Sequence, residues 1–173
     1  ASIFLLSMLT AAPVNWLAEP NRLTESQLFE FGTRHASLKF TLGITRPKYV
    51  YRQRKYENQY DVIRLPLPYQ LVNYLVTLEV MPTADELQVY LSQVRKELGL
   101  TYLSKQRVES SLQIILKNYI KGCNSHVAEL ISRVPLNQAP ALYYSSHTNE
   151  ELVAFYKQAI VWLNQDNHFQ TDY

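Results

Sequence analysis

Two arginines far apart in the sequence stand where the residue pattern predicts the ends of helices. Arg46 precedes Pro47, which disfavours helical geometry, so we expect Arg46 on a turn just beyond a helix that ends near Gly43. Arg107 follows the predicted N-cap Ser104 and is expected in the first turn of a helix, where exposed amides favour an anion. Both guanidinium groups could therefore bind a phosphate or a carboxylate. The alternatives are that Arg46 only interacts with the dipole of the preceding helix and that Arg107 is a surface residue.

A basic and aromatic stretch follows Arg46. Its basic residues are Lys48, Arg52, Arg54 and Lys55, and its tyrosines are Tyr49, Tyr51 and Tyr56. The alternation of residues 60–67 predicts a strand, so this region is expected to form two short strands with a basic tip. Such a hairpin could lie along DNA, with arginines paired to phosphate oxygens. A hairpin tip that is merely solvated is the alternative.

Further candidate binding or catalytic residues lie in the second half of the chain. Lys105 adjoins Arg107, Arg133 precedes the turn at Pro135, and Tyr143 and Tyr144 stand in tandem. Tyrosines in globular domains are more often packing residues than nucleophiles, and that reading applies to this pair as well.

Composition excludes several classes of site. The net charge of +2 neither demands nor excludes a nucleic acid. The single Cys123 excludes an internal disulfide framework, and no Cys/His cluster has metal-ligand spacing, so we predict no metal and a reducing, cytoplasmic setting. With four glycines and no glycine-rich loop, a nucleotide cofactor is not expected. The apolar run 2–12 is too short to span a bilayer, and we predict a core helix and no membrane partner, although the core of a signal peptide is an alternative.

The remaining pattern predicts a mainly α (α+β) fold, in which a helical domain carries a small antiparallel β-hairpin sheet. Capping boxes at Thr24–Gln27, Thr83–Glu86 and Thr148–Glu151 predict three helix starts. The predicted elements are an irregular connection at 13–21, a helix from Thr24 to near Gly43, a strand at 60–67, and helices over 69–78, from Thr83 to Gly99, over 103–121, from Asn124 to about Ile131, and from Thr148 to about Leu163. We expect one domain over 1–173, with an N-terminal helix and linker at 1–22, a core at 23–164 and a polar tail at 165–173.

Several motifs then follow one another in an order that resembles the catalytic domain of the tyrosine recombinase (phage integrase) family. They are Leu42-Gly43-Ile44-Thr45-Arg46, the strand and step from Ile63 to Val72 with Pro66-Leu67-Pro68, Ser104-Lys105-Gln106-Arg107, Gly122-Cys123-Asn124, Leu130-Ile131-Ser132-Arg133, and Tyr143-Tyr144. The resemblance covers about residues 25 to 160.

The resemblance implies DNA strand breakage and rejoining through a 3′-phosphotyrosyl intermediate. Tyr143 or Tyr144 would be the nucleophile, Arg46 and Arg107 would stabilise the charge on the phosphate, and Lys55, or less favourably Lys48, would protonate the leaving oxygen. The residues implied to bind DNA are Lys48, Arg52, Arg54, Lys105 and Arg133. The family also has an upstream DNA-clamping domain, which is expected to be truncated here or supplied by a partner.

Three departures from the family pattern fall on the chemistry. Ser104 stands where the family has a histidine, and Arg133 stands where it has a histidine or a tryptophan. Tyr49 replaces an acidic residue. Because general acid and base groups are missing, we predict a protein that binds double-stranded DNA, with weakened or lost strand transfer and a possible homo-oligomer on DNA. The alternatives are an active recombinase and a protein-interaction module that has kept the fold and lost DNA binding.

Overall fold

The computed structural model describes residues 1–32, 34–50, 53–133 and 148–164, and for residues 40–50 and 53–61 it describes the backbone alone. The helices are α1 (Ser2–Thr10), α2 (Val14–Leu17), α3 (Arg22–Glu25), α4 (Tyr69–Val76), α5 (Ala84–Leu98), α6 (Lys105–Glu109), α7 (Ser111–Tyr119), α8 (Ser125–Ile131) and α10 (Asn149–Asn164). The strands β1 (Phe29–Phe31), β2 (Ala36–Val50) and β3 (Gln53–Leu67) form one antiparallel sheet in that order. Most regular structure in the described chain is helical, which confirms the predicted α+β class with a small sheet.

Helix α1 lies at the centre of the helical body. Leu6 and Leu9 are almost fully buried, and α1 contacts α2, α4, α6 and α7. Because buried residues occur on several sides of α1 rather than on one stripe, neighbours can cover it all round. Tyr156 of α10 donates its hydroxyl to the carbonyl of Leu9 at 3.0 Å. The predicted N-terminal core helix is therefore confirmed, and it ends at Thr10 because Ala11 adopts a left-handed conformation with a φ of 52°.

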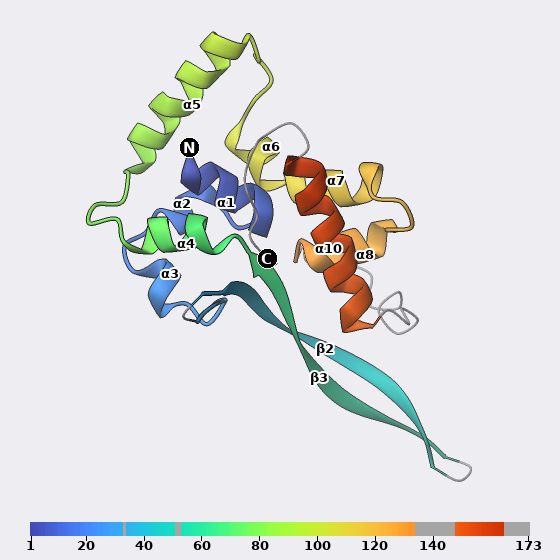
Figure 1. The fold of residues 1–173 in the computed structure, drawn as a ribbon. Coiled ribbons are helices and arrows are strands. Elements are labelled where there is room, and N and C mark those ends of the chain that lie inside the picture. Colours follow the sequence, from blue (N-terminus) through green and yellow to red (C-terminus); the bar gives the residue numbers. More distant parts are fainter. Residues whose placement is uncertain (33, 51–52, 134–147, 165–173) are drawn as a thin grey trace.

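Strands β2 and β3 form a long hairpin. They pair antiparallel in one register from Ala36 opposite Leu67 to Val50 opposite Gln53. At the base, β1 pairs with residues 36–38 of β2, and Leu38 is fully buried in the core. Beyond this base the two strands extend away from the helices as a two-stranded ribbon (Figure 1). The predicted strand at 60–67 is confirmed, and it is longer than the sequence pattern indicated.

The predicted helix from the Thr24 capping box to Gly43 is wrong. Helix α3 ends at Glu25 with Thr24 inside it, and the chain then enters β1 and β2. Arg46 therefore lies within β2, opposite Glu57, and not on a turn after a helix.

The sequence of β2 explains this outcome. Leu38, Phe40, Leu42 and Ile44 recur at every second position, which is the period of a strand rather than of a helix. An interior glycine and proline are unfavourable in a helix, and β-branched and aromatic residues favour a sheet. Pro47 is tolerated because β2 has an open edge beyond its pairing with β1.

Most other helix predictions are confirmed, together with the local interactions that start or end the helices. The N-terminal hydrogen bonds join Thr83 with Glu86, Asn124 with Val127, and Thr148 with Glu151. Helix α4 follows Pro68 as expected, and α5 ends at Gly99, whose φ of 65° suits glycine. The connection predicted as irregular at 13–21 contains the short helix α2.

The single helix predicted over 103–121 is instead divided into α6 and α7. The hydroxyls of Ser110 and Ser111 both donate to the carbonyl of Arg107, at 3.3 and 2.8 Å. Such side-chain bonds compete with the backbone ladder and bend helices. The division turns the start of α7 relative to α6 and shapes the wall of the pocket described below.

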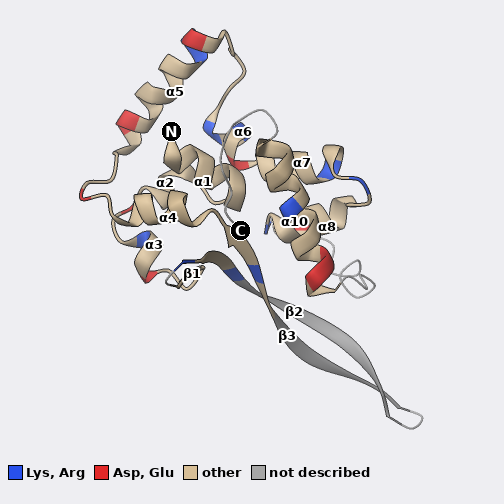
Figure 2. Cartoon of the chain, viewed as in Figure 1, with Lys and Arg blue, Asp and Glu red and all other residues tan. Residues whose placement is uncertain are grey.

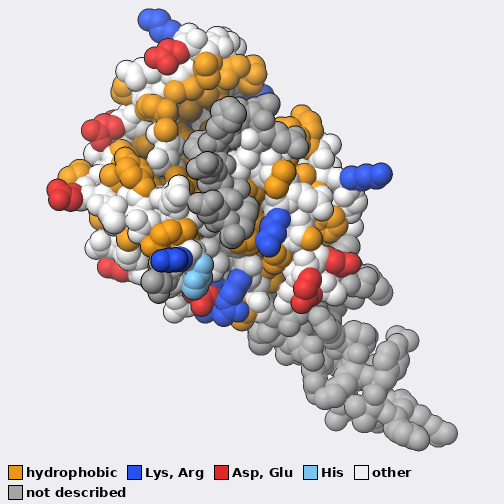
Figure 3. Space-filling model, viewed as in Figure 1, with side chains coloured by type: hydrophobic (Ala, Val, Ile, Leu, Met, Phe, Trp, Pro, Cys, Tyr) orange, Lys and Arg blue, Asp and Glu red, His pale blue; other side chains and the backbone are white. Residues whose placement is uncertain are grey.

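Helix α5 stands at the edge of the body. Leu87 and Leu91 are buried, and the Tyr90 ring stacks on Phe4 with centroids 5.7 Å apart. Leu98 at the far end is 65% exposed. Figure 3 shows apolar side chains gathered over this helix, so part of its apolar surface stays in contact with solvent.

Candidate functional site: the β2–β3 hairpin and the Arg133 pocket

Four predicted site residues lie on the hairpin. In the register of β2 and β3, Lys48 is opposite Lys55 and Arg54 is opposite Tyr49, while Arg46 is farther from the tip. Like charges opposite each other on an antiparallel pair are unfavourable unless solvent or a ligand compensates them. Arg52 lies outside the described residues, as do the candidate nucleophiles Tyr143 and Tyr144.

Two further predicted residues lie on α6, whose first turn is capped as expected. The Ser104 hydroxyl accepts the amide of Arg107 at 3.2 Å. The Arg107 guanidinium lies over the Tyr102 ring, 5.2 Å from its centroid, in a cation–π contact. Lys105 donates from Nζ to Oδ1 of Asn15 at 3.1 Å. Both cations therefore already have partners within the protein, Arg107 in Tyr102 and Lys105 in Asn15.

All described candidate residues except Arg133 fall into two groups, one on the hairpin and one on α6. The hairpin carries Arg46, Lys48, Arg54 and Lys55, and in Figure 1 its distal half runs away from α6, which carries Arg107. Figure 2 shows charges of both signs spread over the helical body. The basic stretch of the hairpin therefore stands apart from a body of mixed charge.

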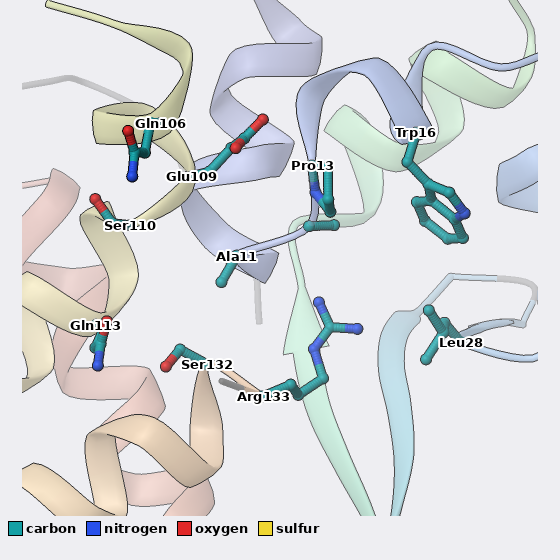
Figure 4. A pocket seen from close by; sticks show the side chains of 11 residues that line it. Ala11, Pro13, Trp16, Leu28, Gln106, Glu109, Ser110, Gln113, Ser132 and Arg133 are labelled. Carbon is teal, nitrogen blue, oxygen red and sulfur yellow. The ribbon is translucent and has the colours of Figure 1, made fainter. Parts of the chain in front are cut away.

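Arg133 belongs to neither group, because it lines a pocket in the body. The pocket has a volume of about 490 Å³ and lies between the turn from α1 to α2, the α6–α7 wall and the end of α8. Gln106, Ser110 and Gln113 lie on one side of it, and Trp16 and Leu28 lie on the other (Figure 4). Volumes of this size are typical of small-molecule sites.

The guanidinium of Arg133 is incompletely paired. Nη2 donates to the carbonyl of Thr10, whereas Nε is buried and has no hydrogen-bond partner. No carboxylate forms an ion pair with Arg133 in the part of the chain that the structure describes. Burial lowers the pKa of Arg133, because desolvation disfavours the charged form. The group nevertheless stays protonated near neutral pH, because a guanidinium group is a very strong base.

Glu109 holds the opposite wall of the pocket in place. Its Oε1 accepts the backbone amide of Val14 at 2.8 Å, which ties α6 to the start of α2. This bond satisfies an amide that no residue of α2 itself can pair, because it belongs to the first turn. Glu109 thus positions the turn at Pro13, which lines the pocket.

Sequence reasoning identified Arg133 but missed the rest of this pocket. Gln106, Glu109 and Trp16 come from segments far apart in the sequence, and no local motif links them. The turn Ala11-Ala12-Pro13, between two apolar segments, was the one local signal of a bend in this region.

Other chemistries find less support in the described residues. Cys123 is buried, and desolvation raises its pKa to about 11, so the thiol remains protonated and unreactive near neutral pH. Among the described residues, no group of three or more His, Cys, Asp or Glu side chains could hold a metal ion. No helix in the described ranges combines the length and apolar character that crossing a bilayer requires.

The chain was compared with known proteins at three levels. No protein-family model, no curated protein and no solved structure matches it.

Proposed function

We propose that this chain binds double-stranded DNA and that the distal part of the β2–β3 hairpin is the principal contact. The observation that carries the proposal is the long two-stranded ribbon that projects from the helical body (Figure 1). The charged residues of segment 48–55 are Lys48, Arg52, Arg54 and Lys55, and all four are basic. A projecting ribbon with a basic tip is suited to a negatively charged groove.

The dimensions of the hairpin agree with those of DNA. At about 3.3 Å per residue, the stretch from Gly43 to Val50 extends over about 26 Å. The major groove is about 12 Å wide and admits a two-stranded β-ribbon. A ribbon of this length can therefore follow the groove over about eight base pairs, at about 3.4 Å per pair.

Electrostatics favours the hairpin over the helical body as the contact. The chain has a net charge of only +2, so attraction to DNA must come from a local excess of positive charge. The hairpin provides such an excess in its sequence, whereas the body carries both signs. Assembly of copies on DNA and a cytoplasmic location are further parts of this proposal.

Weakened strand transfer, in a fold like that of the tyrosine recombinases, is a second candidate. Its support is that the hairpin leads through Pro66 and Pro68 into α4, in the order that the resemblance implies. The strand that replaces the expected helix before Arg46 counts against it. A covalent adduct with a nicked duplex, lost in Tyr143→Phe or Tyr144→Phe, would distinguish strand transfer from binding alone.

The test of DNA binding compares two triple variants by fluorescence anisotropy with a labelled duplex at about 50 mM salt. Lys48→Gln, Arg54→Gln and Lys55→Gln remove three hairpin charges. Lys96→Gln, Lys117→Gln and Lys121→Gln remove three exposed charges from the helical body as a matched control. We expect the hairpin variant to bind at least about tenfold more weakly, because each charged contact contributes to affinity through counterion release.

The control variant is expected to bind like the wild type. Equal losses in both variants would show that only the net charge matters. If the wild type has no affinity for the duplex at low salt, the DNA proposal fails and the chain is better described as a protein-interaction module.

A further inference from the structure

Among the residues that the structure describes, no carboxylate is paired with the partly buried arginine of the pocket. Arg133 donates one hydrogen bond to Thr10, its Nε has none, and no ion pair of Arg133 is found within the described ranges. An ion removed from water without a counter-ion is strongly unfavourable, and an unsatisfied buried donor in a native structure calls for an explanation, such as a bound water or ion. The guanidinium of Arg133 is therefore available to an anion that enters the pocket.

The backbone at Arg133 adds a second unfavourable feature. Its φ of 55° lies in the left-handed region, which glycine and asparagine adopt more readily than arginine. Arg133 directly follows the C-cap of α8, a position where a left-handed residue commonly ends a helix. This helix end sets the position of Arg133, whose side chain faces the pocket (Figure 4).

The rest of the lining limits the kind of anion. Pro13, Trp16 and Leu28 provide an apolar surface, and Gln106 and Gln113 provide neutral hydrogen-bonding groups. A bare inorganic ion would leave the apolar surface and most of the volume of about 490 Å³ unused. Only one cation lines the described pocket, and the carboxylate of Glu109 lies in the opposite wall, so one negative charge is better matched than two.

We propose that the pocket binds a small organic monocarboxylate, whose carboxylate meets Arg133 and whose apolar body lies against Trp16 and Leu28. A guanidinium group suits a carboxylate because its N–H donors match the geometry of the two oxygens. This site is independent of the hairpin and of the proposed DNA binding.

Titration with benzoate tests the proposal, with the two tryptophan indole N–H signals in ¹H–¹⁵N spectra as reporters. Trp16 lines the pocket, whereas Trp162 of α10 packs on Tyr119 of α7, with ring centroids 4.5 Å apart. We expect the Trp16 signal to shift in a saturable way with a Kd below about 10 mM, while the Trp162 signal stays in place. Shifts of equal size at both indoles would overturn the proposal.

Two matched probes test the role of the charge on the wild-type protein. Benzamide has the same shape without the negative charge and is expected to bind at least about tenfold more weakly than benzoate. Inorganic phosphate supplies an anion without an apolar body and should not displace benzoate at equal concentration. If benzamide binds as well as benzoate, or if phosphate displaces it, the monocarboxylate assignment is wrong.

Arg133→Met gives an independent readout. The variant removes the unpaired charge at similar volume, so we expect it to lose benzoate binding by at least about tenfold while its thermal midpoint without ligand is unchanged or higher. A variant that loses thermal stability and still binds benzoate would assign Arg133 a structural role only. If Arg133→Met does not fold, the benzamide and phosphate comparisons on the wild type still decide the question.

Discussion

The hairpin and the Arg133 pocket both carry basic residues, but these residues stand in different parts of the fold. The hairpin extends from the body as a ribbon whose basic residues cluster in sequence near its tip, whereas Arg133 is packed between α1, α2 and α8. Exposed charges act over about 8–10 Å and are screened by salt, and buried charges act at contact and resist screening. Under the two proposals, basic residues would provide salt-sensitive attraction at the hairpin and selective binding in the pocket.

The two regions also differ in how they depend on the rest of the fold. The base of the hairpin joins the core through Leu38 and Leu65, and the distal ribbon is held by the pairing of β2 with β3. The pocket, in contrast, exists only because three helical segments meet. We therefore expect the distal hairpin to be separable from folding and the pocket to be inseparable from it.

Shortening the hairpin is expected to have the largest effect. Leu42 and Asp61 are opposite each other, so replacing residues 43–60 with Asn-Gly closes a short hairpin at a position where the strands already pair. The shortened protein should lose at least about 100-fold in affinity for duplex DNA at low salt, because five basic residues are removed. Its thermal midpoint should change little, because the core is untouched. Anisotropy and thermal unfolding measure the two effects.

A control with the same length as the wild type guards against effects of shape. The hairpin can be kept while Arg46, Lys48, Arg52, Arg54 and Lys55 are all replaced by glutamine. If this protein binds DNA as well as the wild type, the ribbon acts through its shape and not its charge. If hairpin shortening unfolds the body, the two regions are not separable and the comparison fails.

Glu109→Ala is expected to have a smaller effect, confined to the body. It leaves the Val14 amide without its acceptor, and we expect a loss of about 1–3 kcal/mol in the free energy of unfolding, measured by urea denaturation. Glu109→Gln keeps an acceptor oxygen and should lose less. DNA affinity should be unchanged in both variants. Equal destabilisation by alanine and glutamine would show that the charge of Glu109, rather than this hydrogen bond, holds the wall.

The features that were predicted best from the sequence are those that local interactions determine, such as helix starts. The helix starts at Thr83, Asn124 and Thr148 follow from side chains that bond amides a few residues away, and the structure has all three bonds. Between Thr24 and Gly43, the helical spacing of apolar residues gave the wrong prediction. The conformation there is decided by pairing with β3, which comes later in the chain.

The candidate site was less accessible to sequence reasoning. Arg133 was recognised as a cation able to bind an anion, but its burial depends on α1 and α2, at the other end of the chain. Glu109 carried no signal of its own, because its partner is a backbone amide. The division at Ser110 arises from two serine hydroxyls that a helical pattern alone does not weigh.

The salt dependence of DNA affinity tests the central claim most directly. For wild type and for the hairpin triple variant at Lys48, Arg54 and Lys55, log K against log salt concentration is linear, with a slope of about −0.9 for each phosphate neutralised. We predict that the slope of the triple variant is shallower than that of the wild type by about 2 to 3. The same slope in both proteins would contradict the assignment of the hairpin as the DNA contact.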